Sequence, residues 1–427
     1  MAKTKITVKE LDTKKLDDYA WESETPSKII DGYWVFASVK EQTNHKRKFK
    51  NNKTGKWLVF VDIKELDKTW KTIKQATEKG ILGIGAKAAT AKPNPNASSE
   101  NEKVICVYTY NWQDVDDVYR VEKSLRSIGI ETTLYYKTDQ DTGEGNYKVN
   151  GSTNISKYIS KATKSFKKFD LASLNGIGYE KVEILRRIGV KNFDDLLAFD
   201  TSQKLERVGV STQYINKLKL YALSQIENKI YKLRPVPIPN NEIVHFDIET
   251  DLSLSYHNKK VWSVAVHHNN EVKRFYADTW KQENKILKDF LKFIKDLENP
   301  SLFSHSGVGF DKNILASAFK RHDLDADYFI NCNHFDLCTL LRQNYVMPVK
   351  SYGLKEVGKF LGYKFKNDHF DGLYVAMKYI QCQRTGEKLP KDIFHYIDDD
   401  VKAMDFIIKQ IQNRPDIKDV FDHNIND

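Results

Sequence analysis

The sequence predicts a multidomain protein with an α+β domain at residues 1–163, a small all-α domain at 164–233 and an α/β domain with a mixed sheet at 234–427. Three observations lead to this prediction. Strand-like and helical segments alternate in the first part, helical patterns alone fill the middle, and a proline-rich linker precedes a second series of strands and helices. A chain of 427 residues is long enough to build several separate cores.

The first domain contains five strand-like runs and two helical patterns. The strands are expected at Tyr33–Val39, Lys56–Val61, Ile81–Ala89, Lys103–Tyr110 and Glu131–Lys137, and the helices at Lys64–Glu78 and Asp114–Ile128. Ala91–Asn101 is expected to be an exposed loop, and Gln140–Thr153 a turn or hairpin tip. These patterns predict an antiparallel sheet with both helices on one face.

The last domain follows the linker Arg234–Asn240, which holds three prolines. Its strands are expected at Val244–Thr250, Val261–His268, Glu271–Ala277 and Ser301–His305, and its helices at Ile286–Leu297, Lys312–Arg321 and in a segment that opens near Tyr396 and runs through Val401–Gln412. This order is typical of a mixed sheet flanked by helices.

Charge is divided unevenly along the chain. Residues 1–240 hold 42 Lys and Arg against 30 Asp and Glu, a net of +12, whereas 241–427 hold 26 against 28, a net of −2. A basic half would attract a polyanion, although a lysine-rich surface composition explains the charge alone equally well. The four cysteines form no CxxC pair, which favours a reducing, cytoplasmic setting, and no stretch is apolar enough to suggest a membrane span.

Two carboxylates stand out within Val-His-Phe-Asp-Ile-Glu-Thr. Asp247 and Glu249 are two residues apart in a predicted strand, so they share one face. Carboxylates held together repel unless a cation neutralises them, and divalent cations bind oxygen ligands. Asp311 enters a predicted helix, where by itself it could be an N-cap. Tyr396 and Asp400 are four apart on one helix face.

Taken in order, these residues resemble the Tyr-containing subclass of the DEDD-type, DnaQ-like 3′–5′ exonucleases. The segments His334-Phe335-Asp336-Leu337, Ser351-Tyr352-Gly353-Leu354-Lys355 and Asp371-Gly372 extend the likeness to the YprB-type ribonuclease H-like domains, over about Asn241–Gln412. The resemblance implies a ribonuclease H-like fold, hydrolysis of DNA or RNA from single-stranded 3′ ends, and two Mg²⁺ or Mn²⁺ ions.

The same resemblance implies a role for each acid. Asp247 would bridge the two ions, Glu249 and Asp400 would complete the nucleophile-side ion, and Asp311 would serve the second. Tyr396 would orient the attacking water, since a phenol with a pKa near ~10 is a poor general base. Asp398 and Asp399 are expected to point away from this face, as charge at the N-terminus of the helix.

The middle segment Leu174-Asn175-Gly176-Ile177-Gly178-Tyr179 looks like a helix-hairpin-helix element, followed by a looser copy over Leu205–Ala222. The resemblance implies phosphate binding by backbone N–H groups at a helix start. The residues expected to contribute are Gly176, Gly178, Lys181, Arg186, Arg187 and Lys191. The alternative is a purely structural helical bundle.

Short motifs in the first domain resemble putative phosphothreonine-lyase-like domains, a group thought to share the curved sheet of cap-binding translation initiation factors. They are Gly55-Lys56-Trp57-Leu58, the helix with Trp70, and Leu82-Gly83 followed by Ala86-Lys87. His45 is the only histidine before residue 245, which argues against lyase chemistry. Tryptophans 34, 57, 70 and 112 could stack on bases, but we expect at least two to be buried in the core.

The favoured interpretation is a metal-dependent 3′–5′ exonuclease with nucleic-acid-binding modules before its catalytic domain. Two alternatives stay open at this level. The C-terminal domain could bind nucleic acid in a regulatory protein without cutting it, or the N-terminal domain could act on phosphoproteins with the nuclease as a passenger. No residue that would discriminate ribose from deoxyribose is identifiable.

Overall fold

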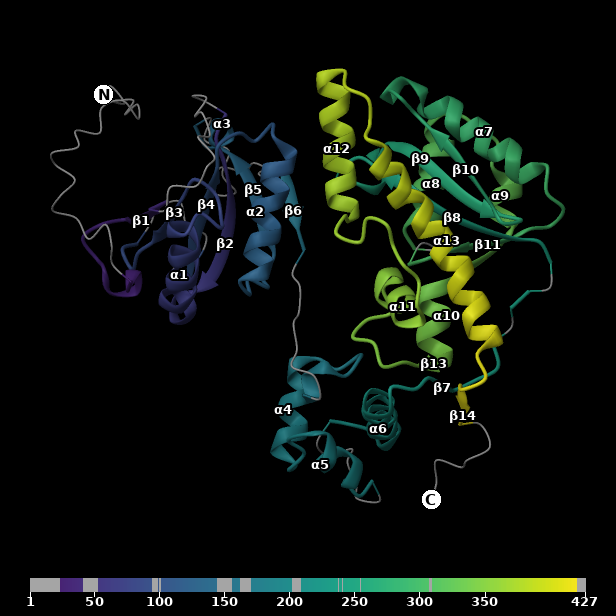
Figure 1. Cartoon of the computed structure of the whole chain (residues 1–427), viewed down its shortest axis with the longest axis horizontal. Coiled ribbons are helices and arrows are strands. Elements are labelled where there is room, and N and C mark those ends of the chain that lie inside the picture. Colours follow the sequence, from purple (N-terminus) through teal and green to yellow (C-terminus); the bar gives the residue numbers. More distant parts are fainter. Residues whose placement is uncertain are drawn as a thin grey trace. The chain divides into compact units, whose positions relative to one another are not determined.

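A computed structural model of the chain forms two compact units, residues 1–165 and 166–427 (Figure 1). The structure describes residues 24–40, 53–93, 99, 101–143, 156–161, 170–201, 209–236, 238–239, 241–253, 255–306 and 309–420. The predicted middle and C-terminal domains both lie in the second unit.

The first unit is built on a six-stranded sheet in the order β1-β3-β4-β2-β5-β6, and every pairing is antiparallel, as predicted. The strands are β1 (Trp34–Ser38), β2 (Gly55–Asp62), β3 (Gly85–Ala89), β4 (Glu102–Thr109), β5 (Leu134–Thr138) and β6 (Tyr158–Ser160). A short 3-10 helix, η3 (Pro26–Lys28), precedes them.

Helices α1 (Ile63–Glu78) and α2 (Val115–Ser127) supply the apolar cover for this sheet. Each begins at an aspartate whose side chain accepts a hydrogen bond from a first-turn amide, so both helix starts are capped locally. Trp57 and Trp70 are fully buried, and the indole of Trp57 donates to the carbonyl of Val118 in α2. The expectation that at least two tryptophans lie in the core is confirmed.

Two segments of this unit differ from their predictions. The strand expected to begin at Ile81 begins at Gly85. Residues 80 and 81 instead terminate α1: Gly80 has a left-handed φ of 68°, and the amide of Ile81 donates a hydrogen bond to the carbonyl of Ala76. The expected turn after Thr138 begins with a helix, α3 (Asp139–Gly143), since Thr138 and Asp141 exchange side-chain hydrogen bonds. The rest of that turn lies outside the described residues.

The second unit opens with short helices. They are η5 (Leu171–Ser173), α4 (Tyr179–Arg187), α5 (Phe193–Ala198) and α6 (Thr212–Glu227). Gly176 at φ 77° and Gly209 at φ 79° each stand three residues before a helix start, at α4 and at α6. Both helix starts are therefore preceded by the same left-handed backbone conformation, which is strained for a residue with a Cβ atom.

The main sheet of this unit has the order β10-β9-β8-β11-β12 and is mixed, as predicted: the β8, β11 and β12 pairings are parallel and the other two are antiparallel. Its strands are β8 (Ile243–Thr250), β9 (Val261–His268), β10 (Glu271–Tyr276), β11 (Ser301–Ser304) and β12 (Asn333–Asp336). The elements between them include η7 (Tyr256–Asn258), η8 (Trp280–Gln282), α7 (Glu283–Lys295), α8 (Asp311–Arg321) and α9 (Asp327–Asn331).

The chain after β12 is mostly helical. It forms α10 (Leu337–Asn344), α11 (Leu354–Leu361), α12 (Gly372–Thr385) and the long α13 (Lys391–Asn413). Three two-residue strands, β7 (Tyr231–Lys232), β13 (Tyr345–Val346) and β14 (Lys418–Asp419), make a small second sheet. Within the described residues, no helix combines the length and apolar character that a membrane crossing needs.

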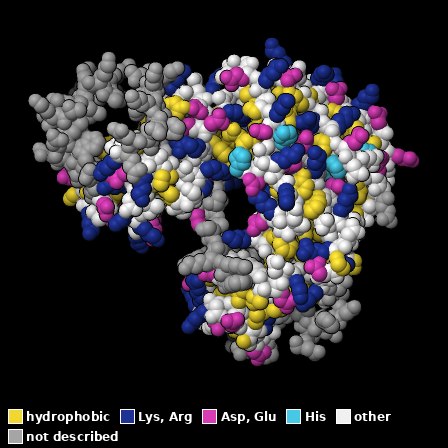
Figure 2. Space-filling model, viewed as in Figure 1, with side chains coloured by type: hydrophobic (Ala, Val, Ile, Leu, Met, Phe, Trp, Pro, Cys, Tyr) yellow, Lys and Arg dark blue, Asp and Glu magenta, His cyan; other side chains and the backbone are white. Residues whose placement is uncertain are grey.

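Basic and acidic side chains are interspersed over the face of the second unit that Figure 2 shows. The core lies beneath, on both faces of the main sheet. Phe246 of β8 packs on one face against the rings of Phe290 and Phe329, at centroid distances of 6.4 and 6.1 Å. Residues 245, 247 and 249 alternate onto the other face of β8, which α13 crosses.

Candidate active site

The candidate site lies where the parallel strands of the main sheet end. Because β8, β11 and β12 run in parallel, their carboxyl ends meet at one edge of the sheet. Asp247 and Glu249 stand in β8, the loop after β11 leads to Asp311, and Asp336 ends β12. The fold therefore gathers acids from three separate chain segments at one edge.

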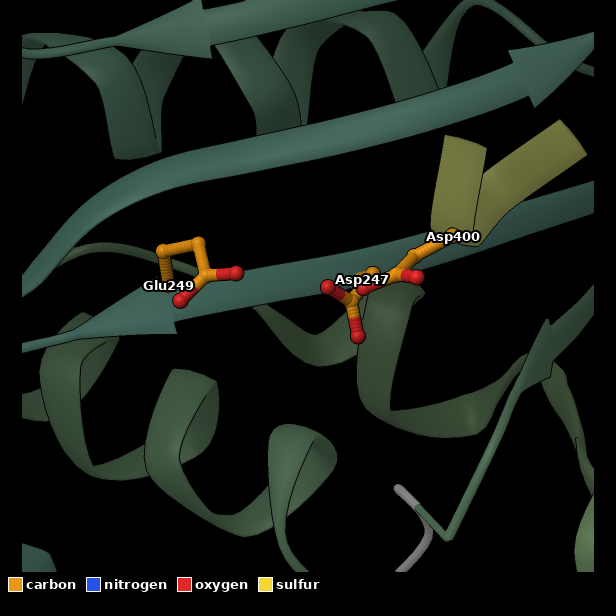
Figure 3. A group of neighbouring side chains, drawn as sticks. All are labelled: Asp247, Glu249 and Asp400. Carbon is orange, nitrogen blue, oxygen red and sulfur yellow. The ribbon is translucent and has the colours of Figure 1, made fainter. Parts of the chain in front are cut away.

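Two of these carboxylates, Asp247 and Glu249, form a tight group with Asp400 of α13. Asp247, Glu249 and Asp400 each offer an oxygen, and these oxygens lie within 4.8 Å of one another. Figure 3 shows Asp247 and Glu249 on β8 and Asp400 reaching them from α13. Among the described residues, this is the one group of three or more potential metal ligands of this kind. The structure thus brings together residues that are 153 positions apart in the sequence, such as Asp247 and Asp400.

The electrostatics of the group are unfavourable in the absence of a cation. Burial, and then the charge of Asp311, raise the pKa of Asp247 well above its ordinary value. Burial, and then Asp247 and Asp400, do the same to the pKa of Glu249. Burial followed by Asp247 raises the pKa of Asp400, against the opposing effects of Lys355 and a hydrogen bond from Tyr396. Each of these groups would ionise fully only beside a compensating positive charge.

Asp311 is the fourth predicted ligand and lies outside the tight group. It is 4% exposed and is the first residue of α8, whose N-cap position is Phe310, so the N-cap alternative is wrong. Burial, and then the charge of Asp336, raise the pKa of Asp311 to about 8. Asp311 in turn is close enough to Asp247 for its charge to raise the pKa of that residue. It occupies a neighbouring position in the same acidic region.

Ser306, in the segment between β11 and α8, has an unusual backbone conformation. Ser306 has φ 61°, the left-handed region that most residues avoid, and its amide donates to Asp336 over 3.1 Å. Asp336 also accepts from the amide of Thr339, capping α10. Gly307 and Val308, the middle of the predicted turn, lie outside the described residues.

Tyr396 shares its helix face with Asp400, as the four-residue spacing predicts. Its side chain is buried, and burial, followed by the charge of Asp400, raises the pKa of the phenol well above its ordinary value. The hydroxyl therefore stays protonated at neutral pH, and it hydrogen-bonds to Asp400. A protonated phenol at this position can orient a nucleophile but cannot act as its base.

Lys355 is the residue of the site whose role the sequence did not reveal. It extends from α11, and its ammonium lies 4.6 Å from the centre of the Tyr396 ring. It donates to the carbonyl of Phe370. Burial lowers its pKa, while Asp400 acts in the opposite direction. In the sequence, Ser351 to Lys355 is part of a family resemblance. The packing of α11 against α13 is what places its lysine over Tyr396 and close enough to Asp400 to interact electrostatically.

The expectation for Asp398 and Asp399 is wrong in part. Helix α13 begins at Lys391, so both residues lie in its interior and cannot act as charge at its N-terminus. They do point away from the Asp400 group. Asp399 is 5% exposed and accepts a hydrogen bond of 2.7 Å from the amide of Lys366. Asp398 pairs with Arg274 at 3.4 Å. Both hold neighbouring segments against α13.

The predicted phosphate-binding residues of the helical segment have different surroundings. Lys181 donates to the carbonyl of Gly209 and so ties the first helix entry to the second. Arg186 pairs with Glu183 at 2.8 Å on the surface. The other members of the set, Gly176, Gly178, Arg187 and Lys191, are exposed. The structure leaves these four accessible and gives Lys181 a structural contact.

The sequence also matches known protein families in two regions. Residues 244–412 match the model of the RNase H superfamily. The C-terminal region is an RNase H superfamily domain. This RNase H domain includes every member of the candidate active site. Residues 37–142, which span most of the first unit's sheet, match the family of the basophilic leukemia-expressed protein Bles03.

Solved structures of exonuclease I are also similar to the chain. The exonuclease I structure that suggests how processivity is achieved is 14% identical over 36% of this chain, with a TM-score of 0.26. The zinc-bound E. coli exonuclease I complex with single-stranded DNA is 14% identical over 36% of the chain, with a TM-score of 0.27. The chain covers 43% and 42% of those two proteins.

Proposed function

We propose that the RNase H domain is a metal-dependent 3′–5′ exonuclease that hydrolyses phosphodiester bonds of DNA or RNA. The observation that supports this most directly is the group of the partly buried Asp247 and the buried Glu249 and Asp400, whose oxygens lie within 4.8 Å of one another. The direction of cleavage and the DEDD and YprB-type assignments rest on the order of the motifs that end in Tyr396 and Asp400.

The donor set fits Mg²⁺ or Mn²⁺. All three side chains offer hard oxygen ligands. Burial, and then the charge of neighbouring acids, raises the pKa of each, and a divalent cation would offset this cost of ionisation. Asp247, Glu249 and Asp400 would hold one ion, and Asp247 with Asp311 a second. When bound, such ions supply Lewis acidity that lowers the pKa of a water and stabilises charge on the leaving oxygen.

The remaining residues would position the reactants. Tyr396 keeps its proton, so its hydroxyl would donate to an oxygen in the site and fix the direction of attack. Lys355 adds a positive charge beside Asp400 and could contact a substrate phosphate. The main-chain carbonyl of Phe370 restrains this lysine, so its charge is held in place rather than free to swing away.

The helix entries at Gly176–Gly178 and at Gly209 would bind the phosphate backbone beyond the cut site. Their support is the shared positive φ three residues before α4 and α6, together with the exposure of Gly176, Gly178 and Gly209, since the amides of a helix start can bind a phosphate. The side chain of Asn175 donates to the carbonyl of Lys350 over 3.3 Å. That loop leads into α11, so a strand held there would lie near the helix that bears Lys355.

End-labelled oligonucleotides test the proposed function. Full-length protein with Mg²⁺ should shorten a single strand one nucleotide at a time from its 3′ end, and EDTA should stop the reaction. Ladders that shorten from the 5′ end, or internal cuts, would reject the direction. Binding without any cleavage in Mg²⁺ or Mn²⁺ would instead favour the regulatory alternative.

We expect Tyr396→Phe to lower kcat about tenfold while KM changes little. The substitution removes one hydroxyl that orients the nucleophile and leaves every carboxylate in place. Steady-state kinetics on a short oligonucleotide measure this, and Tyr363→Phe is a matched control because its hydroxyl hydrogen-bonds Asp399 outside the acidic group. An equal loss in both variants would show that the effect is structural.

Lys355→Met should lower kcat roughly tenfold to a hundredfold, because it removes a fixed positive charge beside the reacting groups while keeping the length of the side chain. Lys359→Met is its control, since Lys359 lies on the same helix and pairs at the surface with Asp368 at 2.8 Å. Single-turnover rates at saturating protein separate chemistry from binding. A rate equal to that of wild type would remove Lys355 from the mechanism.

A further inference from the structure

The face of the first unit's sheet that α1 and α2 leave uncovered has a composition unlike a core. In β1, Val35 and Ala37 are buried on the helix side, so Trp34 and Phe36 point to the opposite face. The register places Phe36 opposite Lys87 of β3. Phe36 is 36% exposed, which makes this end of the face accessible.

Three lysines lie on that same face. Lys87 pairs in register with Cys106 of β4, and Lys56 of β2 pairs with Tyr108 of β4 on one side and with Lys137 of β5 on the other. Two ammonium groups directly opposite each other in a sheet destabilise it. Lys56 and Lys137 are nevertheless both buried. Asp139 offsets part of this charge through an ion pair of 2.5 Å with Lys56.

Lys87 differs from the other two. Among the described residues its ammonium makes no ion pair or hydrogen bond. It lies 4.1 Å from the centre of the Trp34 ring and 5.8 Å from that of Tyr108. Burial, opposed by Cys106 but reinforced by the charge of Lys56, lowers its pKa. A half-buried cation that lies over aromatic rings and beside a second lysine is costly unless an anion approaches it.

We propose that this face, defined by Trp34, Phe36, Lys56, Lys87, Tyr108 and Lys137, binds single-stranded nucleic acid, with a phosphate on Lys87 and bases on the aromatic rings beside it. Lysines alternating with aromatic side chains match the two parts of each nucleotide. The buried Lys56 and Lys137 would attract the phosphate electrostatically without contacting it. The aromatic rings favour a strand with unpaired bases over a phosphopeptide, which would use only the cations.

The proposal concerns the first unit alone. It assigns a nucleic-acid-binding surface to that unit, and it does not depend on whether the RNase H domain cleaves nucleic acid. The region lies within residues 37–142 except for Trp34 and Phe36, which precede the Bles03 match. Because it involves binding and no hydrolysis, it can be tested with the metals removed.

Fluorescence anisotropy of a labelled oligonucleotide tests the proposal on the full chain in EDTA, across a salt series, with both deoxy- and ribo-strands. Lys87→Gln should weaken binding roughly threefold to tenfold and reduce the salt slope by about 0.7, the value for one contact to a single strand. Phe36→Ala should weaken binding roughly tenfold with an unchanged slope, as loss of one stacking ring predicts.

Lys68→Gln is the matched control, because Lys68 has a side chain that is 85% exposed on α1. Melting curves confirm that each variant folds. Photocrosslinking with a 5-iodouracil strand then locates the contact, which should map to β1 or β4. Equal affinity and slope for Lys87→Gln, Lys68→Gln and wild type would overturn the proposal. Crosslinks confined to residues 166–427 would also overturn it. So would a Lys87→Gln variant that lost binding to a phosphothreonine peptide but bound the oligonucleotide as wild type does.

Discussion

Asp400→Asn should reduce cleavage by about 10³-fold or more, or at least ~4 kcal/mol in the barrier, while substrate affinity changes little. Asp400 stands in the tight carboxylate group with Asp247 and Glu249, so an amide there replaces an anionic ligand by a neutral one of the same shape. Affinity for a long strand would come mainly from basic regions elsewhere, which the substitution leaves intact.

The neighbouring Asp398→Asn is the natural comparison, because it lies on the same helix yet pairs with Arg274 outside the group. It should keep most of the wild-type rate. Rates would be measured under single-turnover conditions in Mg²⁺, and binding in Ca²⁺ with the same oligonucleotide. If Asp400→Asn cut as fast as Asp398→Asn, the carboxylate group would not be catalytic and the regulatory alternative would gain support.

The sequence predicted the regular parts of the fold because their patterns are local. Alternation along β8 and β9, and the strong apolar face of α7, depend on residues within one element. The pairing of Asp247 with Glu249 follows from the same period of two. Asp400 could be added only through a resemblance, since no local pattern shows that α13 crosses β8 at that residue.

The sequence-based predictions were wrong or incomplete where the structure depends on a tertiary contact, or on a helix start that lies several residues before the motif. The sequence pattern places the start of α13 near Tyr396, but the helix begins at Lys391, where Pro390 precedes it and Asp392 lies in its first turn. Lys355 was not assigned a role because its partners are 41 and 45 residues away, at Tyr396 and Asp400. Such contacts depend on how two helices pack, which a single sequence does not specify.

The second large effect should be a dependence of stability on both Mg²⁺ and pH. Folding raises the pKa of Asp247, Glu249 and Asp400, and raises that of Asp311 to about 8. Between about pH 4, the value for an unfolded carboxyl, and about pH 8, these four acids therefore bind more protons in the metal-free folded protein than in the unfolded chain. Their contribution to stability falls as the pH rises through that window.

Mg²⁺ should reverse this loss, because it binds the ionised acids of the folded state and competes with their protons. At a hundred times the dissociation constant it adds about 2.7 kcal/mol, or roughly 5–10 °C in the melting temperature of the second unit. The gain should be larger at pH 8 than at pH 6. Calorimetry in EDTA and in Mg²⁺ at matched ionic strength measures it.

Asp247→Asn separates a specific site from a general salt effect, since it removes one ligand and one source of repulsion together. In EDTA at pH 8 this variant should be more stable than wild type, and in Mg²⁺ it should gain much less. An equal Mg²⁺ response in both proteins would remove Asp247 from the metal site. A gain that did not grow from pH 6 to pH 8 would show that the acids are already ionised without a cation, and the electrostatic basis of the proposed nuclease would then fail.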